Sequence, residues 1–143
     1  MFDKRTIAAS LRTEAAKREF HLLYGGTERT AAEQADRYEA LLTTYAEHFG
    51  CEGEAPAFFS SPGRTEIVGN HTDHNHGLVL AAAVTLDTLA AAAPTGDGII
   101  TLYSQGYDKP FVVDTRDLEK KEAEKNTTDA LIRGVCRKLH DMG

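Results

Sequence analysis

The most regular hydrophobic pattern in the chain lies between residues 31 and 49, where apolar positions recur every three or four residues. These positions are Ala35, Tyr38, Leu42, Tyr45 and Phe49. The pattern predicts a helix that lies on a core and ends at Gly50, because glycine readily adopts the left-handed conformation that closes helices. Residues 1–24 form a second helical candidate with a weaker period, which ends at the pair Gly25-Gly26.

From residue 55 onward, short apolar runs alternate with turn residues, as is typical of strands. We expect strands at residues 57–60, 66–69, 78–84, 99–104 and 111–114. Pro62-Gly63 predicts a bend between the first two runs. The alanines at residues 90–93 are assigned to a strand because Pro94 follows them, although alanine intrinsically prefers helices.

Two further segments complete the expected fold. Thr95-Gly-Asp-Gly98 contains the Asp-Gly pair of a tight turn and predicts a β-hairpin. Residues 126–129 supply capping side chains for a final helix. The apolar stripe of that helix comprises Leu131, Ile132, Val135, Cys136, Leu139 and Met142. Together these elements predict an α+β fold, with a mixed, largely antiparallel sheet and packed helices.

Composition narrows the classes of function. The 143 residues suit one domain, and the formal net charge of -6 disfavours nucleic acid or an anionic membrane as a partner. The charged N-terminus lacks the apolar core of a signal peptide, and no apolar run approaches the roughly 20 residues of a membrane helix. We therefore expect a cytoplasmic protein. Cys51 and Cys136 belong to no CxxC pattern, which argues against a disulfide framework.

The residues that carry chemistry gather in the run from Ser60 to Gly77. Arg64 is a permanent cation whose planar fork of donors suits a carboxylate or a phosphate. The carboxylate of Asp73 accepts hydrogen bonds and can take two from neighbouring sugar hydroxyls, whereas His71 and Asn70 can each donate or accept. This combination favours a pocket for a polar ligand, and we interpret it as a sugar site.

Two other interpretations of the same run stay open. His71, Asp73, His74 and His76 are all possible ligands of zinc or a related ion, although their spacing matches no helical metal motif such as HExxH. A solvated loop without a ligand is the simpler alternative, because turns are generally rich in Asn, Asp and Gly.

A family resemblance favours the sugar site. The run Pro62-Gly-Arg-Thr-Glu-Ile-Val-Gly-Asn-His-Thr-Asp-His-Asn-His-Gly-Leu-Val-Leu80 resembles the galactokinase signature PGRVNLIGEHTDYNxGxVL. The resemblance extends over about residues 35–143. Galactokinases are GHMP kinases, two-domain α+β enzymes that use ATP and Mg²⁺ to phosphorylate the C1 hydroxyl of galactose. The resemblance therefore implies a sugar kinase.

The resemblance also implies roles for individual residues. Arg64 would be catalytic, lying between the C1 end of the sugar and the transferring phosphate. Asp73 would hold the ring hydroxyls, and Asn70 and His71 would contact the hydroxyl at the far end. Asn70 replaces a glutamate of the family pattern, and His74 replaces a tyrosine, so the sugar can be galactose or a related sugar.

The resemblance implies that residues 1–143 correspond to the N-terminal portion of a galactokinase-like domain, with the phosphate loop, the general-base aspartate and the second domain expected beyond them. No Walker motif GxxxxGK[ST] occurs. We accordingly expect the chain to bind a sugar, to lack kinase activity alone, and to self-associate through apolar surface. The alternative within the family is a non-catalytic, sugar-binding regulatory relative.

Overall fold

The computed structural model describes residues 1–69 and 72–143, so the predicted site residues Asn70 and His71 lie outside the described residues. The chain divides into two compact units, Met1–Ala93 and Pro94–Gly143, each of which is described by itself. In the described ranges, no helix is both long and apolar enough to span a membrane.

Three helices open the first unit: α1 (Lys4–Ser10), α2 (Glu14–Tyr24) and α3 (Glu28–Phe49). The prediction of a single helix over residues 1–24 is therefore wrong in detail. The break occurs because the Thr13 hydroxyl accepts a hydrogen bond from the backbone N–H of Ala16 and so caps a new helix. The end of α3 at Gly50, which has a φ of 74°, is confirmed.

The core of the first unit lies between α2 and α3. Its buried side chains come from the predicted apolar face of α3 and from the facing side of α2: Phe20, Tyr24, Ala31, Ala35 and Tyr38, with Leu11 from the connection between α1 and α2. Phe58 and Leu89 pack against this cluster from the neighbouring strands. The expectation that the long helix lies on a core is thus confirmed.

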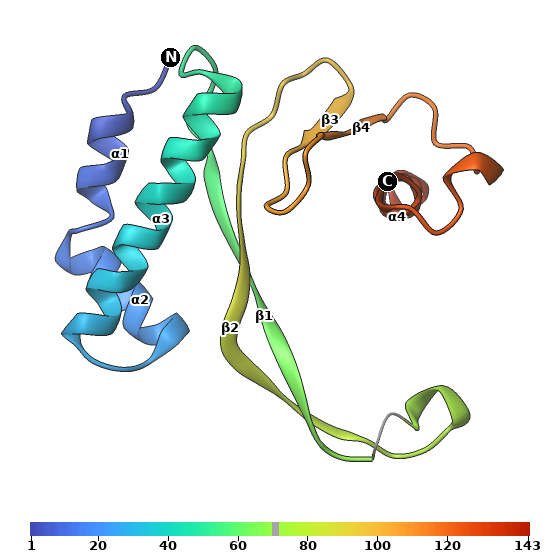
Figure 1. Cartoon of the computed structure of the whole chain (residues 1–143), viewed down its shortest axis with the longest axis horizontal. Coiled ribbons are helices and arrows are strands. Elements are labelled where there is room, and N and C mark those ends of the chain that lie inside the picture. The colour runs from blue at the N-terminus through green and yellow to red at the C-terminus, as the bar shows by residue number, and fades with distance from the viewer. Residues whose placement is uncertain (70–71) are drawn as a thin grey trace. The chain divides into compact units, whose positions relative to one another are not determined.

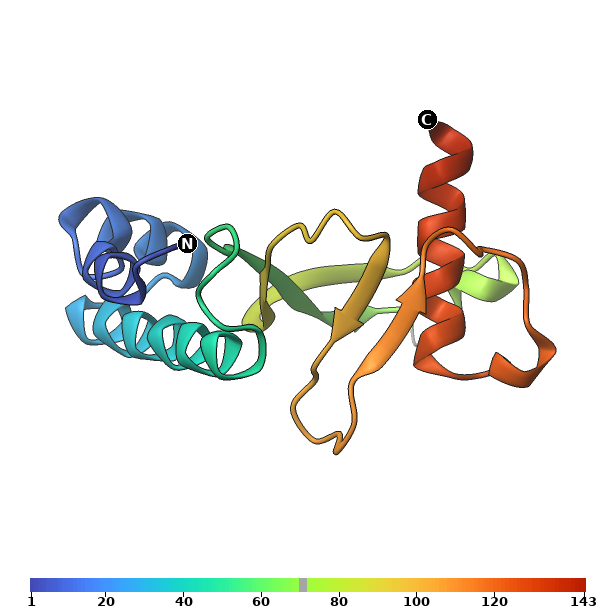
Figure 2. The same ribbon diagram turned by 90° about the horizontal axis from the view of Figure 1, so that it is seen from above.

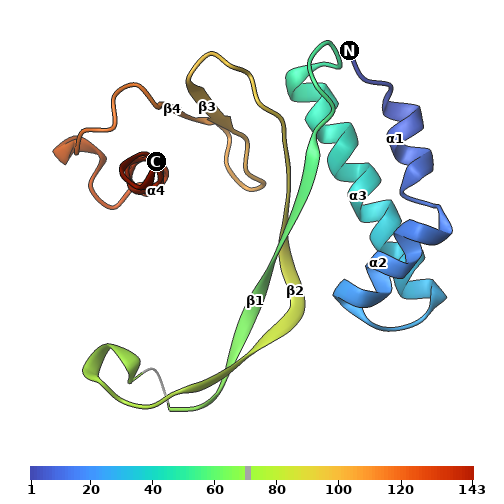
Figure 3. The same cartoon turned by 180° about the vertical axis from the view of Figure 1, so that it is seen from behind.

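Those strands are β1 (Ala57–Val68) and β2 (Leu80–Ala92), which pair as a long antiparallel ribbon. Figures 1 and 3 show the helices alongside one end of this ribbon, while the connection between the strands lies at its opposite end. The predicted bend at Pro62-Gly63 instead falls inside β1, where the pairing register shifts. The alanines assigned to a strand do belong to β2 as far as Ala92.

The second unit contains β3 (Ile99–Leu102), β4 (Phe111–Asp114), a short 3₁₀ turn η2 (Glu122–Glu124) and α4 (Thr128–Met142), the long helix that Figure 2 shows at the C-terminus. The strand β3 pairs with β4, whereas β2 pairs with β1. The hairpin predicted across residues 95–98 is therefore wrong, because the Asp-Gly turn joins two strands that belong to different sheets.

The predicted α+β class, with antiparallel strand pairing, is confirmed by these elements. The final helix also forms as predicted, and the Thr127 hydroxyl caps it by accepting from the backbone N–H of Ala130. Its apolar stripe is largely exposed, with Leu131, Val135, Leu139 and Met142 each more than half exposed. Its buried residue is instead Arg133.

Candidate functional site

The connection between β1 and β2 carries the predicted site, and Arg64 leads into it. Arg64 is an exposed residue of β1, paired in the antiparallel register with Ala83 of β2. The neighbouring positions of β2 are also alanines, Ala81 and Ala82. Ala83 has only a methyl side chain, so the residue opposite Arg64 crowds the arginine little.

Gly69 follows β1 in a conformation that other residues rarely adopt. Its φ is 117°, and a Cβ atom there would lie 2.6 Å from the Cγ1 of Val79 and 2.7 Å from the carbonyl oxygen of Leu78. The glycine of the motif thus permits close approach of the two strands at the mouth of the loop. Its carbonyl accepts hydrogen bonds from the backbone N–H and the hydroxyl of Thr72, at 3.2 and 2.7 Å.

Thr72 in turn organises the rest of the loop. Its carbonyl accepts from the backbone N–H groups of Asn75 and Gly77, at 3.0 and 2.9 Å, which closes the 3₁₀ turn η1 (Asp73–Asn75). A Cβ atom on Gly77 would lie 2.2 Å from the Thr72 hydroxyl oxygen, so this glycine is required by close packing. His76 has a positive φ of 63° between these residues. Residues 72–77 are therefore folded into a turn by their own hydrogen bonds.

Two of the four predicted site residues lie in the described part of the chain. Arg64 belongs to strand β1, and Asp73 opens the turn η1. Asn70 and His71 lie outside the described residues, so the predicted roles of these four residues stay predictions. The side chains of Asn75 and His74 are 3.2 Å apart at Nδ2 and Nε2. Among the described residues, no three His, Cys, Asp or Glu side chains are grouped so that they could hold a metal ion.

The same ribbon also contains a buried carboxylate that was not predicted from the sequence. Asp87 of β2 has a side chain that is only 3% exposed. Its Oδ2 accepts hydrogen bonds from the hydroxyls of Tyr24 at 2.7 Å and Ser60 at 2.5 Å. Its Oδ1 accepts from Nη1 of Arg37 at 2.5 Å, and its backbone carbonyl accepts from Nη2 of the same residue at 3.2 Å. We call Tyr24, Arg37, Ser60 and Asp87 the Asp87 network.

The electrostatics of the network favour the ionised carboxylate. Burial alone would raise the pKa of Asp87, but the hydrogen bonds from Ser60, Tyr24 and Arg37 outweigh burial and bring the pKa below its usual range. The hydroxyl oxygens of Tyr24 and Tyr38 are 3.0 Å apart. Burial raises the pKa of Tyr38 above its usual range, and this hydrogen bond adds to the effect. The network is thus an ionised, hydrogen-bonded group inside an otherwise apolar layer.

One signal in the sequence could have revealed Asp87. It is the single charged residue between Leu78 and Gly96, within a run of mostly Ala, Val and Leu. A lone carboxylate in a predicted half-buried strand needs partners, because burying an unpaired charge is costly. The identity of those partners depends on residues 27 to 63 positions away along the chain, which the pattern does not reveal.

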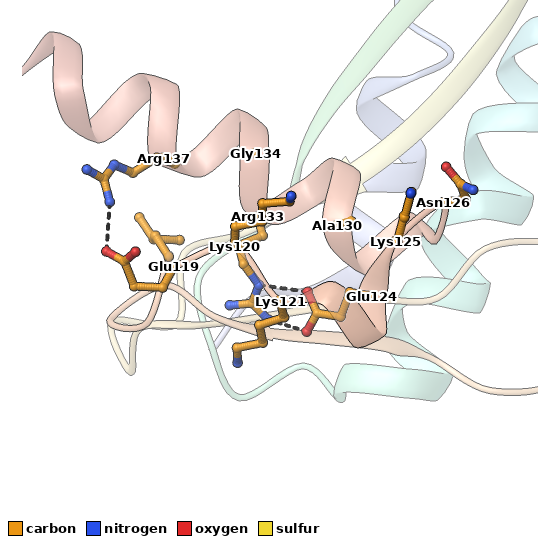
Figure 4. Close-up of a pocket in the computed structure, with 11 residues that line it drawn as sticks. Glu119, Lys120, Lys121, Glu124, Lys125, Asn126, Ala130, Arg133, Gly134 and Arg137 are labelled. Atoms are coloured by element: carbon orange, nitrogen blue, oxygen red, sulfur yellow. Dashed lines mark hydrogen bonds and ion pairs between the residues drawn. The ribbon is translucent and has the colours of Figure 1, made fainter.

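The second unit has a hollow of its own, beside α4 (Figure 4). Arg133 lies in its wall and forms a two-pronged ion pair with Glu124, at 2.8 Å for each prong. Its Nη1 also donates to the carbonyl oxygen of Asp117. Arg137 binds Glu119 at 3.1 Å in the same wall. Because these charges are paired with each other, we infer a structural role for them: they attach the segment that precedes α4 to the helix.

Comparisons with known proteins gave one family model and several similar proteins. The family model of the galactokinase galactose-binding signature matches residues 43–94. The chain is 40% identical over 87 residues to a galactokinase of Lactococcus lactis subsp. lactis, covering 59% of the chain and 22% of the relative. It is 36% identical over 107 residues to a galactokinase of Streptococcus suis, covering 73% and 26%. It is 43% identical over 68 residues to a galactokinase of Homo sapiens, covering 46% and 17%.

The chain thus spans about a quarter or less of the length of these relatives. No solved structure matches the fold of the chain. The matched region includes the end of α3, both strands of the ribbon and the loop between them.

Proposed function

We propose that the chain carries the sugar-binding half of a galactokinase-type sugar kinase, because it matches the galactokinase galactose-binding signature and is 36–43% identical to galactokinases over part of its length. The observation that supports this function is the ordered motif from Pro62 to Leu80, which folds as two paired strands around a turn closed by its own hydrogen bonds. The hydrogen bonds of Thr72 hold the backbone of residues 72–77 in a defined turn, and a preorganised backbone lowers the cost of binding a small polar ligand.

The proposed roles follow the chemistry of each side chain. The Asp73 carboxylate accepts hydrogen bonds from ring hydroxyls, and Asn70 and His71 contact the hydroxyl at the far end of the sugar. Arg64 lies at the C1 end, where its permanent charge stabilises the negative charge of a transferring phosphoryl group. Asn70 in place of glutamate replaces an acceptor-only group by one that also donates, which makes galactose or a related sugar the expected ligand class.

ATP and Mg²⁺ are the expected co-substrate and ion of the reaction, in which the γ-phosphoryl group is transferred to the C1 hydroxyl. The residues described here do not fit them as a site: no acidic cluster suited to a metal ion occurs among the described residues. The sequence also contains no GxxxxGK[ST] phosphate loop. The chain spans about a quarter or less of the length of its galactokinase relatives, and on this ground we propose that residues 1–143 correspond to the N-terminal portion of a galactokinase-like domain and have no kinase activity alone.

Sugar binding is the direct test of this function. We would titrate the purified chain with a panel of hexoses, galactose included, and follow the backbone amide resonances of residues 60–80 by NMR. We expect one sugar to shift these resonances saturably, and we expect Asp73→Ala to abolish the shifts because the ring hydroxyls lose their acceptor. Asp108→Ala, which changes an exposed aspartate of the second unit, is the matched control.

The outcomes separate the candidate functions. Shifts that persist in Asp73→Ala, or an absence of any saturable shift, would refute the sugar site. Sugar-dependent formation of ADP from ATP by the wild-type chain would refute the proposed lack of kinase activity. Shifts that require a divalent metal and vanish with a chelator would favour the metal interpretation of the histidines.

A further inference from the structure

The ribbon contains a bulge immediately before Arg64. Pro62 pairs with Asp87, whereas Arg64 pairs with Ala83, so β2 advances four residues while β1 advances two. Residues 84–86 of β2 therefore lie opposite the single residue Gly63. A bulge of this kind bends the strand and changes the direction of the side chains that follow. The orientation of Arg64 thus depends on where the bulge is placed.

Gly63 fits the bulge because it has no side chain. A Cβ atom there would lie 3.0 Å from the carbonyl oxygen of Leu86 and 3.3 Å from the Cγ2 of Val84, both on the bulged strand. Flanking residues of β1 from Pro62 to Val68 are all exposed, so no buried side chain of this segment fixes the register. Register is weakly specified where neither face of a strand is buried. Phe58 and Leu89 pack against the core further along the ribbon, so the anchored group nearest the bulge is the candidate for placing it.

Asp87 is that group, because it lies at the edge of the bulge and is held from several elements. Tyr24 of α2 and Arg37 of α3 bind its carboxylate from the helical layer, and Ser60 binds it from β1, two residues before Pro62. Arg37 also binds the backbone carbonyl of Asp87, which fixes the main chain of β2 directly. These bonds tie one defined point of the ribbon to the core of the unit.

We propose that Asp87 is a positioning residue that sets the bulge opposite Gly63 and thereby orients Arg64 toward the bound ligand. The inference rests on the proposed function, in which Arg64 meets an anionic oxygen at the C1 end of the sugar. A slip by one residue would turn every side chain beyond the bulge to the opposite face of the ribbon. Loss of the anchor therefore removes Arg64 from the site while leaving the helical core in place.

The test compares Asp87→Asn with Asp36→Asn. Asp36 lies on α3 and forms an exposed ion pair with Arg12. Its substitution therefore removes a carboxylate of the same unit that does not contact the ribbon. The first measurement is the NMR resonance of the Arg64 Nε–Hε group, together with hydrogen exchange of the backbone amides of residues 63–65. The second is the sugar affinity, and both are recorded at a temperature where circular dichroism shows each variant to be folded.

We expect Asp87→Asn to shift the Arg64 resonance, to accelerate exchange at residues 63–65 and to weaken sugar binding about tenfold or more, since small misplacements of binding groups have effects of this size. Asp36→Asn should leave all three unchanged. An unchanged Arg64 resonance and unchanged exchange in folded Asp87→Asn would overturn the proposal, whatever the sugar affinity. If Asp87→Asn does not fold, Tyr24→Phe, which removes one bond of the anchor, takes its place with the same criteria.

The two proposals fail separately. If the wild-type chain binds no sugar, the sugar site is refuted, but the Arg64 resonance and the exchange rates still decide whether Asp87 fixes the strand. If sugar binds and Asp87→Asn changes neither readout near Arg64, the sugar site stands and the positioning role is refuted.

Discussion

The direction of the hydrogen bonds around Asp87 predicts that replacing Tyr24 by phenylalanine costs more stability than replacing Tyr38. Tyr24 has one hydroxyl hydrogen and donates it to the carboxylate of Asp87, which can only accept. The hydrogen between Tyr24 and Tyr38, whose hydroxyls are 3.0 Å apart, must then come from Tyr38. The Tyr24 hydroxyl therefore donates one hydrogen bond and accepts another, whereas the Tyr38 hydroxyl only donates.

The magnitudes follow from these roles. Tyr24→Phe removes a hydrogen bond to a buried charge, worth about 1.5–3 kcal/mol, and leaves the hydroxyl of Tyr38 without its acceptor, which costs about 1 kcal/mol more. Tyr38→Phe removes one neutral hydrogen bond, worth about 0.5–1.5 kcal/mol. Both tyrosines are buried, at 8% and 6% exposure, and phenylalanine keeps their ring packing. We expect Tyr24→Phe to lower the free energy of unfolding by about 3 kcal/mol and Tyr38→Phe by about 1 kcal/mol.

Urea denaturation followed by circular dichroism measures both free energies, and the double variant completes a thermodynamic cycle. Because the two substitutions share one hydrogen bond, their combined effect should fall short of the sum by about 1 kcal/mol. Equal costs for the two single variants, a larger cost for Tyr38→Phe, or strict additivity would each refute the assigned direction. Phe20 contacts both tyrosine rings, and Phe20→Leu changes the packing while it leaves every hydroxyl in place. This variant therefore measures how much of the loss of stability comes from packing and not from hydrogen bonds.

Three further predictions concern the same two units. The pKa of Asp87 is lower in the folded protein than in the unfolded chain, so the ionised carboxylate stabilises the fold. This stabilisation is fully present above the usual aspartate pKa of about 3.9 and is lost as pH falls through the lower pKa of the folded state. Asp87→Asn should therefore weaken the loss of stability at acid pH, measured as melting temperature against pH. Gly69→Ala should destabilise the ribbon by about 1–3 kcal/mol in urea titrations, because φ is 117° and Val79 blocks the new Cβ; a neutral effect would contradict the strained conformation. Arg133→Ala should unfold α4, seen as lost helical signal and rapid amide exchange, whereas Arg137→Ala, one turn later and half exposed, should not; equal behaviour of both variants would exclude the buried pair as the anchor of α4.

Local patterns predicted the elements that local physics determines. The period of α3, its end at Gly50 and the capped start of α4 are encoded within a few residues, and each is found. The alanines near the end of β2 were also assigned correctly to a strand, because the proline after them outweighed their helix propensity. The motif between the ribbon strands was equally visible, since its glycines and polar residues lie within one short segment.

Predictions failed where a distant partner decides the outcome. The Asp-Gly turn after Pro94 has the composition of a hairpin, yet β3 pairs with β4, because strand pairing depends on segments further along the chain. Similarly, the apolar stripe predicted for α4 does not include Arg133, yet Glu124 and two backbone carbonyls surround this residue and bury it. Neither choice of partner is encoded in the period of the residues themselves.

The exposed segment from Pro62 to Val68 and the group that anchors the ribbon occupy different parts of the first unit. Residues from Pro62 to Val68, which carry Arg64, are exposed throughout, so this half of β1 gains little stability from burial of its own side chains. The bonds that fix the ribbon gather instead at Asp87, whose partners come from α2, α3 and the start of β1. A motif can therefore be complete in sequence while its geometry depends on helices outside it. It follows that substitutions at Tyr24 or Arg37, which lie outside the matched signature, should affect the orientation of Arg64 more than exposed substitutions next to it.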